Sequence, residues 1–425
     1  MPRARSLWRH RDFMLLWSGQ SISMSGTELS ALAIPFVALT TLSASPLEIS
    51  LLTTAGYLPH LIASLPVGAM VDRRRRRPLL VWCNLCQALV LGSIPLTAAA
   101  GALALPQLYG VAMTAALLAV VFDTAYQSYL PSLLHGDQLV EGHGKLGMSM
   151  SLATVAGQSG AGALITLIGA ARAVTVDAVS YLVSAATLLL IRTPEQPPSP
   201  RPAGSRLRTE IAQGLRYVFR GPLMRPVVVA NALVSAAIGG VWSLWIVYVY
   251  RELHWSAAET GVCMALSAAG GIAGGLLTTR LTQRLGLPLL LLLSVSGYAF
   301  DLIPTLLAGP GIAGYVLVTI GHSVAIAIQT IYIAANRSFR QLICPPELMG
   351  RMNATSRWLA LGSKPLFAAL FGLLATWLGV RAALAAGAAI FTLPTFVLLA
   401  SPLRSIRHVP IPQLTKGDPH EPAAG

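Results

Sequence analysis

Long apolar segments recur along the whole chain, and short polar or charged stretches separate them. An apolar segment of about 18 residues or more with few charges is typical of a helix that crosses a membrane. We count twelve such segments, at roughly 13–41, 48–71 and 78–100, two that end near 128 and 170, and then 173–191, 226–250, 257–279, 287–308, 312–337, 352–378 and 382–400. The pattern predicts an all-α membrane protein with twelve transmembrane helices.

One long polar interruption divides the twelve segments into two groups of six. It begins with a Pro- and Ser-rich stretch, typical of an extended linker, and continues over 206–219 as an amphipathic helix expected on the membrane surface. The predicted domains are a six-helix bundle over 1–191, the linker over 192–225, a second six-helix bundle over 226–401, and a disordered cytoplasmic tail over 402–425.

Two short motifs recur six helices later, as expected for a duplicated bundle. One motif places a glycine five and nine residues before two arginines, at Gly68, Arg73 and Arg77 and again at Gly275, Arg280 and Arg284. The other begins at Gly144 and is similar to the stretch that begins at Gly350. Both recurrences favour two six-helix halves.

The charges are few and unevenly placed. Only 11% of the residues are charged and the formal net charge is +14. By the segment boundaries above, 25 of the 30 lysines and arginines fall on one side of the membrane, and three on the other, Arg172, Arg251 and Arg381. Because Lys and Arg are retained in the cytoplasm, this asymmetry predicts a multi-pass protein of the inner membrane with both termini cytoplasmic, and it argues against a nucleic-acid partner.

Enzyme and metal motifs are not found in the sequence. The four cysteines support no disulfide framework, and Cys83 and Cys86 form one C-x-x-C without a second pair or a histidine cluster, so we expect no metal and no cofactor. No nucleotide-binding, zinc-hydrolase or serine-hydrolase motif occurs, which argues against an enzyme and an ATP-driven pump.

The sharpest chemical candidate is Glu28. It follows Ser18, Ser21 and Ser25 at helical spacing, so the four residues share one face of an otherwise apolar helix. A carboxylate near mid-bilayer needs a partner, a hydrated cavity or a function. Glu28 is therefore expected either to carry a proton or to form a structural pair with another helix, for which Lys364 is the candidate partner.

Other polar residues inside predicted helices extend this site. Asp301 is a second candidate for proton coupling. We expect a substrate cavity lined by polar and aromatic side chains on the predicted helices, namely Ser25, Tyr57, His60, Gln87, Asn231, Trp242, His322, Gln329 and Lys364.

The loop after the second segment carries the pattern G-x-x-x-D-R-x-x-R, at Gly68, Asp72, Arg73 and Arg76, with Arg77 next. This pattern resembles the loop signature of the major facilitator superfamily. The stretches WRHRDFMLLWSGQSIS, VFDTAYQSYLPSLL, TVDAVSYLVSA and RQLICPPELMGRMNA resemble its drug-exporter branch, which includes macrolide efflux proteins and the enterobactin exporter.

The resemblance implies export of amphipathic small molecules by alternating access, driven by proton antiport, with an acidic residue in the middle of the first helix that matches Glu28. It also implies a latch that closes the cytoplasmic side, for which we expect Gly68, Asp72, Arg73, Arg77, Asp123 and Arg351. The expected partners are the substrate, protons and membrane lipids, and the expected state is a monomer.

Two positions depart from the family pattern. Gln158 stands where the antiporter signature of the fifth helix has Pro, and Thr279 stands where the second loop would have Asp. The same fold also permits a solute importer, and a non-transporting membrane sensor is the third alternative.

Overall fold

The computed structural model describes residues 7–71, 73–134, 137–195 and 207–405, and these residues form helices joined by short connections, with no strand among them. The α-helices are α1 (Arg11–Thr40), α2 (Pro46–Val71), α3 (Arg76–Ala99), α4 (Leu105–Leu133), α5 (Asp137–Ile168), α6 (Ala170–Leu190), α7 (Leu207–Arg220), α8 (Met224–Arg251), α9 (Ala257–Leu285), α10 (Leu287–Gly297), α11 (Leu302–Leu307), α12 (Ile312–Ile343), α13 (Met349–Leu378), α14 (Val380–Ile390) and α15 (Leu393–Leu399). Short 3-10 helices are η1 (Leu7–Arg9), η2 (Tyr298–Phe300), η3 (Pro346–Leu348) and η4 (Pro402–Ser405).

The membrane spans follow the hydrophobic pattern. Eleven spans in the described residues are long and apolar enough to cross a membrane. Two of them are built from two helices each, α10 with α11 and α14 with α15. The 26-residue α2 occupies the remaining position between α1 and α3. The prediction of an all-α membrane protein with twelve spans is confirmed.

Two spans that the sequence predicted as continuous helices are interrupted. The ninth span changes to a 3-10 turn at Tyr298–Phe300, and the twelfth breaks at Phe391 and Thr392. The 3-10 turn ends four residues before Pro304, and Phe391 lies three residues before Pro394. A proline has no N–H to give to the carbonyl one turn earlier and its ring crowds that carbonyl, which favours a break at such a position.

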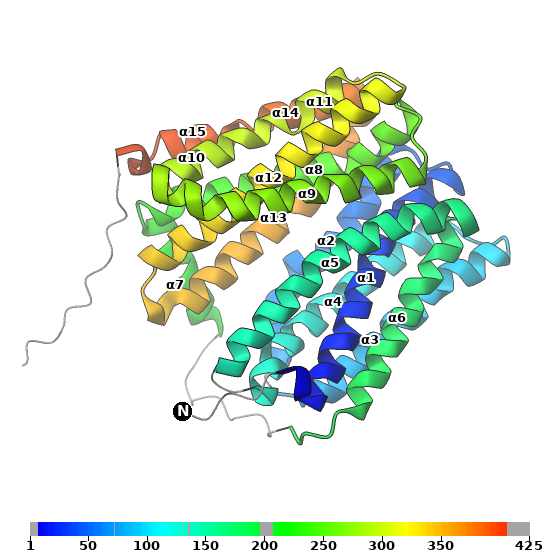
Figure 1. Cartoon of the computed structure of the whole chain (residues 1–425), viewed down its shortest axis with the longest axis horizontal. Coiled ribbons are helices and arrows are strands. Elements are labelled where there is room, and N and C mark those ends of the chain that lie inside the picture. The colour runs from blue at the N-terminus through cyan, green and yellow to red at the C-terminus, as the bar shows by residue number, and fades with distance from the viewer. Residues whose placement is uncertain (1–6, 72, 135–136, 196–206, 406–425) are drawn as a thin grey trace, which may run out of the picture.

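The helices pack into two bundles (Figure 1). In the first bundle α1 packs on α5 and α6, α3 packs on α4 and α6, and α2 packs on α4. The second bundle contains α8 to α15, with α13 against α8 and α12 against α9. The bundles meet mainly where α2 contacts α13 and α8, and where α5 contacts α9.

Because successive spans run in opposite directions, alternate connections lie at the same end of the molecule. We call the end with the α2–α3, α9–α10 and α12–α13 connections the basic end, since most arginines lie there, and the other the far end.

The linker helix α7 packs against the second bundle, on α13 and α8. Val218 is fully buried, and a Cβ at Gly214 would lie 2.5 Å from Thr355 Oγ1, so the two helices approach closely. The hydroxyl of Tyr217 donates a hydrogen bond to the carbonyl of Ile343 across 3.1 Å. Burial raises the pKa of Tyr217, so this hydroxyl keeps its proton and remains a donor.

Candidate functional site

A central cavity of about 350 Å³ lies in the first bundle and reaches α8 of the second. Residues of α1, α2, α3, α4, α6 and α8 line it. Three of the predicted cavity residues are among them, Tyr57, His60 and Trp242. The other walls are largely alanine, leucine and isoleucine, which suits a ligand with apolar surface.

Glu28 does not line this cavity; its side chain lies at the contact of α1 with α5. Its Oε2 accepts a hydrogen bond from Gln158 Nε2 at 3.0 Å, and its Oε1 accepts one from Thr154 Oγ1 at 3.2 Å. The neighbouring Thr27 lines the cavity. A Cβ at Gly157 would lie 2.7 Å from Glu28 Cβ, so glycine permits the helices to come this close.

The pairing of Glu28 with Lys364 that we considered from the sequence is not formed. Lys364 Nζ instead lies 4.6 Å from the centre of the Tyr57 ring, in a cation–π contact between α13 and α2. The Tyr57 and His60 rings are neighbours, with centroids 6.1 Å apart. Three predicted cavity residues therefore come together at the interface of the two bundles.

A second cluster joins two more predicted residues in the second bundle. His322 Nδ1 lies 3.4 Å from Asp301 Oδ1, and both side chains are largely buried. The His322 ring stacks on Trp245 with centroids 5.4 Å apart, and Trp245 stacks on Trp242 at 5.5 Å. Because Trp242 lines the central cavity, the stack connects Asp301 to the cavity wall.

Four predicted cavity residues lie elsewhere. Ser25 donates to the carbonyl of Ser21 within α1, and Gln87 is only 2% exposed in the interior of the first bundle. Gln329 hydrogen-bonds to Tyr298 in the second bundle, and Asn231 is half-buried on α8. None of the four lines the central cavity in this state.

A smaller cavity of about 240 Å³ lies between the bundles toward the basic end, lined by α2, α4 and α13. His60 lines both cavities and so separates them. Arg357 Nη2 lies 3.3 Å from Asp123 Oδ2 on the wall of this smaller cavity, and this ion pair joins the two bundles. Trp358 Nε1 adds a second link by donating to the carbonyl of Leu61 at 2.9 Å.

Among the predicted latch residues of the α2–α3 loop, Arg77 contacts its own bundle. Arg77 donates from Nε to the carbonyl of Leu188 and from Nη2 to that of Leu189, at 2.9 and 2.8 Å, so it caps the end of α6. Arg73 is exposed, and a Cβ at Gly68 would meet nothing within 4 Å. Asp72 lies outside the described residues.

Two further contacts concern the same end of the molecule. Glu195 accepts hydrogen bonds from the backbone N–H groups of Arg76 and Arg77, a cap for α3 that we did not expect from the sequence. Arg351 donates to Gln213 on α7 and thus ties the linker helix to the second bundle.

The far end is closed by direct contacts between the bundles. Arg251 Nη2 donates to the carbonyl of Ala44 at 2.7 Å, and the hydroxyls of Ser50 and Ser243 lie 3.1 Å apart. On the other side of the interface, a Cβ at Gly162 of α5 would lie 3.0 Å from the Cα of Gly261 of α9. At the far end the two bundles are therefore held together by two side-chain contacts and by the close approach of α5 and α9.

Sequence reasoning missed a polar group on α6 that faces the cavity. Asp177 and Tyr181 line the cavity beside Thr27 and Ser30 of α1, and Thr27 Oγ1 lies 2.8 Å from the Tyr181 hydroxyl. The signal was present, because Asp177, Ser180, Tyr181 and Ser184 follow one another at helical spacing.

These features agree with comparisons to known proteins. The family model described as transmembrane secretion effector matches residues 4–419. The multidrug efflux pump Tap of Mycolicibacterium fortuitum is 26% identical over 386 residues, 84% of this chain and 88% of that protein. Macrolide efflux protein A of Streptococcus pyogenes is 24% identical over 185 residues, 43% of this chain and 45% of that protein.

Among solved structures, the nucleoside transporter NupG superposes with a TM-score of 0.75 at 11% identity, covering 92% of this chain and 98% of that one, which supports the fold alone. The match over nearly the whole length shows that this chain belongs to the transmembrane secretion effector family of the major facilitator superfamily.

Proposed function

We propose that this transporter exports amphipathic small molecules from the cytoplasm by alternating access, in exchange for protons. The observation that carries the proposal is the position of Glu28, an acidic residue within a membrane span, next in sequence to the cavity-lining Thr27 and at the contact of two helices. The efflux pumps among its relatives favour the same direction of transport.

The orientation rests on the charge asymmetry. By the sequence segments, 25 of the 30 lysines and arginines fall on the side of the basic end, so we place that end in the cytoplasm. The far end is then extracellular; the bundles are joined there by Arg251, Ser50, Ser243 and the Gly162–Gly261 contact, and at the basic end by the Asp123–Arg357 pair, so the opening of either end depends on contacts between the bundles. A substrate would enter the central cavity from the cytoplasm past His60.

The coupling step follows from the hydrogen bonds of Glu28. An ionised carboxylate accepts strong hydrogen bonds, and protonation removes both the charge and part of this accepting capacity. A proton on Glu28 would therefore weaken its bonds to Gln158 and Thr154. Because these bonds join α1 to α5, the proton changes the packing inside the first bundle and can bias which end is open.

The chemistry of the cavity supports an amphipathic substrate. Apolar side chains form most of the wall, while Tyr57, Tyr181 and Asp177 add hydroxyl groups and a carboxyl group. A substrate with an apolar body and a few polar groups matches such a wall, whereas a sugar or a nucleotide would need many more hydrogen-bonding partners.

The proposal is tested in inside-out membrane vesicles, in which export appears as uptake. We would impose a proton gradient with an acidic vesicle interior. We would then measure the uptake of fluorescent amphipathic drugs by the wild type, Glu28→Gln and Glu259→Gln. The last variant is the control, because Glu259 only caps α9 with Ser256. We expect gradient-driven uptake in the wild type and Glu259→Gln, and its loss in Glu28→Gln.

Two results would contradict the proposal in different ways. Unchanged uptake by Glu28→Gln would remove Glu28 from the proton path but leave an exporter. Uptake that appears only in right-side-out vesicles, with substrate moving inward, would show an importer and overturn the direction.

A further inference from the structure

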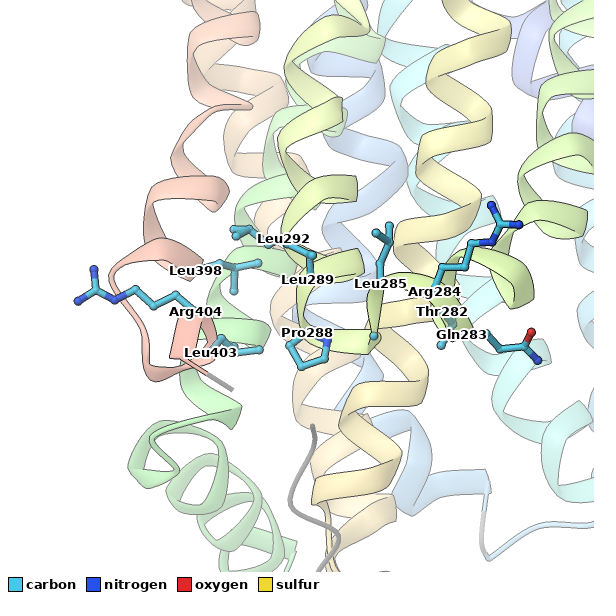
Figure 2. Close-up of a pocket in the computed structure, with 11 residues that line it drawn as sticks. Thr282, Gln283, Arg284, Leu285, Pro288, Leu289, Leu292, Leu398, Leu403 and Arg404 are labelled. Atoms are coloured by element: carbon cyan, nitrogen blue, oxygen red, sulfur yellow. The ribbon is translucent and has the colours of Figure 1, made fainter. Parts of the chain in front are cut away.

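A further cavity lies on the outer face of the second bundle at the basic end, away from the central cavity. It measures about 590 Å³ and is formed by the end of α9, the start of α10, and the segment from α15 to η4 (Figure 2). Figure 1 shows α10 and α15 at the edge of the molecule, away from the first bundle. This volume is within the roughly 300–1,000 Å³ of pockets that hold small ligands.

The cavity has an apolar centre and positively charged side chains at its edges. Leu289, Leu292 and Leu398 form an apolar patch in its centre, and Leu289 is 44% exposed although it belongs to a membrane span. Arg284 and Arg404 lie on opposite sides of these leucines and extend outward (Figure 2). An apolar surface flanked by cations at a membrane boundary matches a lipid with a negatively charged headgroup.

Neither arginine is used by the protein itself. Both side chains are exposed, and among the described residues neither guanidinium has a hydrogen-bond or ion-pair partner. This contrasts with Arg77 at the same end, whose guanidinium caps α6. Arg284 and Arg404 are therefore available to a ligand, and both have long side chains that can turn toward a bound headgroup.

The start of α10 contributes little to the attraction. Gly286 precedes this 11-residue helix without a side-chain cap, but it also ends α9, so the carbonyl end of one helix and the N–H end of the other meet there and their dipoles oppose each other. Pro288, the second residue of α10, has no N–H to offer. The headgroup phosphate would thus be held by the two guanidiniums, with its acyl chains along the exposed leucines.

We propose that this cavity is a binding site for one anionic phospholipid of the cytoplasmic leaflet, held by Arg284 and Arg404 through its phosphate and by Leu289, Leu292 and Leu398 through its acyl chains. The site is separate from the central cavity, so it would hold lipid whether or not the protein exports drugs.

Native mass spectrometry of the purified full-length protein tests this proposal. The protein would be titrated with dioleoyl phosphatidylglycerol, and the binding constant of the tightest lipid compared between the wild type and Arg284→Ala/Arg404→Ala. Each arginine near a membrane surface contributes roughly 1 kcal/mol to the binding of anionic lipid, or about a fivefold change in affinity. We expect the double variant to bind this lipid about 30-fold more weakly.

The control variant is Arg9→Ala/Arg280→Ala. It removes the same charge from the basic end, at two exposed arginines that do not line the cavity. We expect this control to bind phosphatidylglycerol as the wild type does.

Three outcomes would overturn the proposal. An equal loss of affinity in the control variant would show attraction by net charge alone. Equally tight binding of dioleoyl phosphatidylcholine would show an apolar groove without headgroup recognition. Displacement of the lipid by millimolar inorganic phosphate would show a site for free anions.

Discussion

Gln158 donates a hydrogen bond to Glu28 across 3.0 Å, from the fifth span to the first. The antiporter signature of the superfamily has a proline at the position of Gln158, and a proline has neither an amide side chain nor a backbone N–H. In this chain the departure from the family pattern and the candidate proton carrier are thus in direct contact. The family pattern alone would take Gln158 as an argument against antiport, yet the coupling that we propose uses Gln158 as a partner of Glu28.

Replacing Gln158 is therefore expected to impair coupling. Gln158→Ala removes the stronger of two restraints on Glu28, and a hydrogen bond to a charged group contributes about 1.5–3 kcal/mol. We expect gradient-driven drug uptake in inside-out vesicles to fall at least roughly tenfold. Substrate-independent proton leak, followed with a pH-sensitive dye, should rise.

Ser159→Ala is the matched control for this variant. Its hydroxyl donates only to the carbonyl of Val155 in its own helix, so uptake and leak should match the wild type. Normal coupling in Gln158→Ala would show that the hydrogen bond has no part in proton transfer.

The Asp123–Arg357 pair predicts an effect on the cytoplasmic opening. Both side chains are about half exposed, at 50% and 53%, and exposed ion pairs contribute roughly 0.2–1 kcal/mol. Arg357→Ala should therefore favour opening of the basic end by a factor of about 1.4–5. The measurement is the labelling rate of Thr53→Cys, in the central cavity, by an impermeant thiol reagent added to inside-out vesicles.

Two companion variants sharpen this experiment. Arg337→Ala removes an exposed arginine that forms no ion pair among the described residues, and its labelling rate should be that of the parent. Exchange of the two charges, Asp123→Arg with Arg357→Asp, should restore the parent rate. A fast rate in the exchanged protein would argue that the ion pair does not hold the bundles together.

At the far end, loss of the Arg251 side chain should affect labelling from the extracellular side and not from the cytoplasmic side. Its hydrogen bond to the Ala44 carbonyl joins α8 to the α1–α2 turn across the bundles. A typical net contribution of about 1 kcal/mol corresponds to a fivefold shift in population. Arg251→Ala should accelerate labelling of Thr53→Cys about fivefold in right-side-out vesicles and not in inside-out vesicles.

Arg381 provides the control at that end. It donates to the Leu306 carbonyl at 2.6 Å, but both residues belong to the second bundle. Arg381→Ala should leave labelling unchanged from both sides. If it accelerates labelling as much as Arg251→Ala does, the closure of the far end does not depend on contacts between bundles.

The sequence predicted the spans and the polar stripe of Glu28 because both follow from local periodicity, which is a property of neighbouring residues. The partners of Glu28 could not be predicted in this way. Thr154 and Gln158 are 126 and 130 residues away along the chain, and only packing decides which faces of α1 and α5 meet.

The contacts of Arg77 also could not be predicted from the sequence. As one of five consecutive arginines it suggested topology and a latch, and its spacing was that of the family signature. Its use as a cap for α6 depends on the position of carbonyls 111 and 112 residues later. The breaks near Pro304 and Pro394 could not be predicted from the sequence either, because other prolines, such as Pro35 in α1 and Pro365 in α13, lie inside unbroken helices.

Alanine substitutions at two glycines of α9 should have opposite effects on the stability of the protein. The sequence showed four glycines, at 270, 271, 274 and 275, but not which of them permit a close approach. A Cβ at Gly270 would lie only 1.8 Å from the carbonyl oxygen of Ser323 on α12, whereas a Cβ at Gly275 would meet nothing within 4 Å. Gly270→Ala must push α9 and α12 apart, and overpacking of this kind costs about 1–3 kcal/mol.

Gly275→Ala meets no neighbour and replaces a poor helix former, which should add up to about 1 kcal/mol of stability. Thermal unfolding of the two purified variants in the same detergent should therefore give a lower melting temperature for Gly270→Ala and an equal or higher one for Gly275→Ala. Equal destabilisation by both would mean that α9 does not pack on α12 through Gly270. In that case the closeness of these two helices, which fixes the position of His322 on α12, would need another explanation.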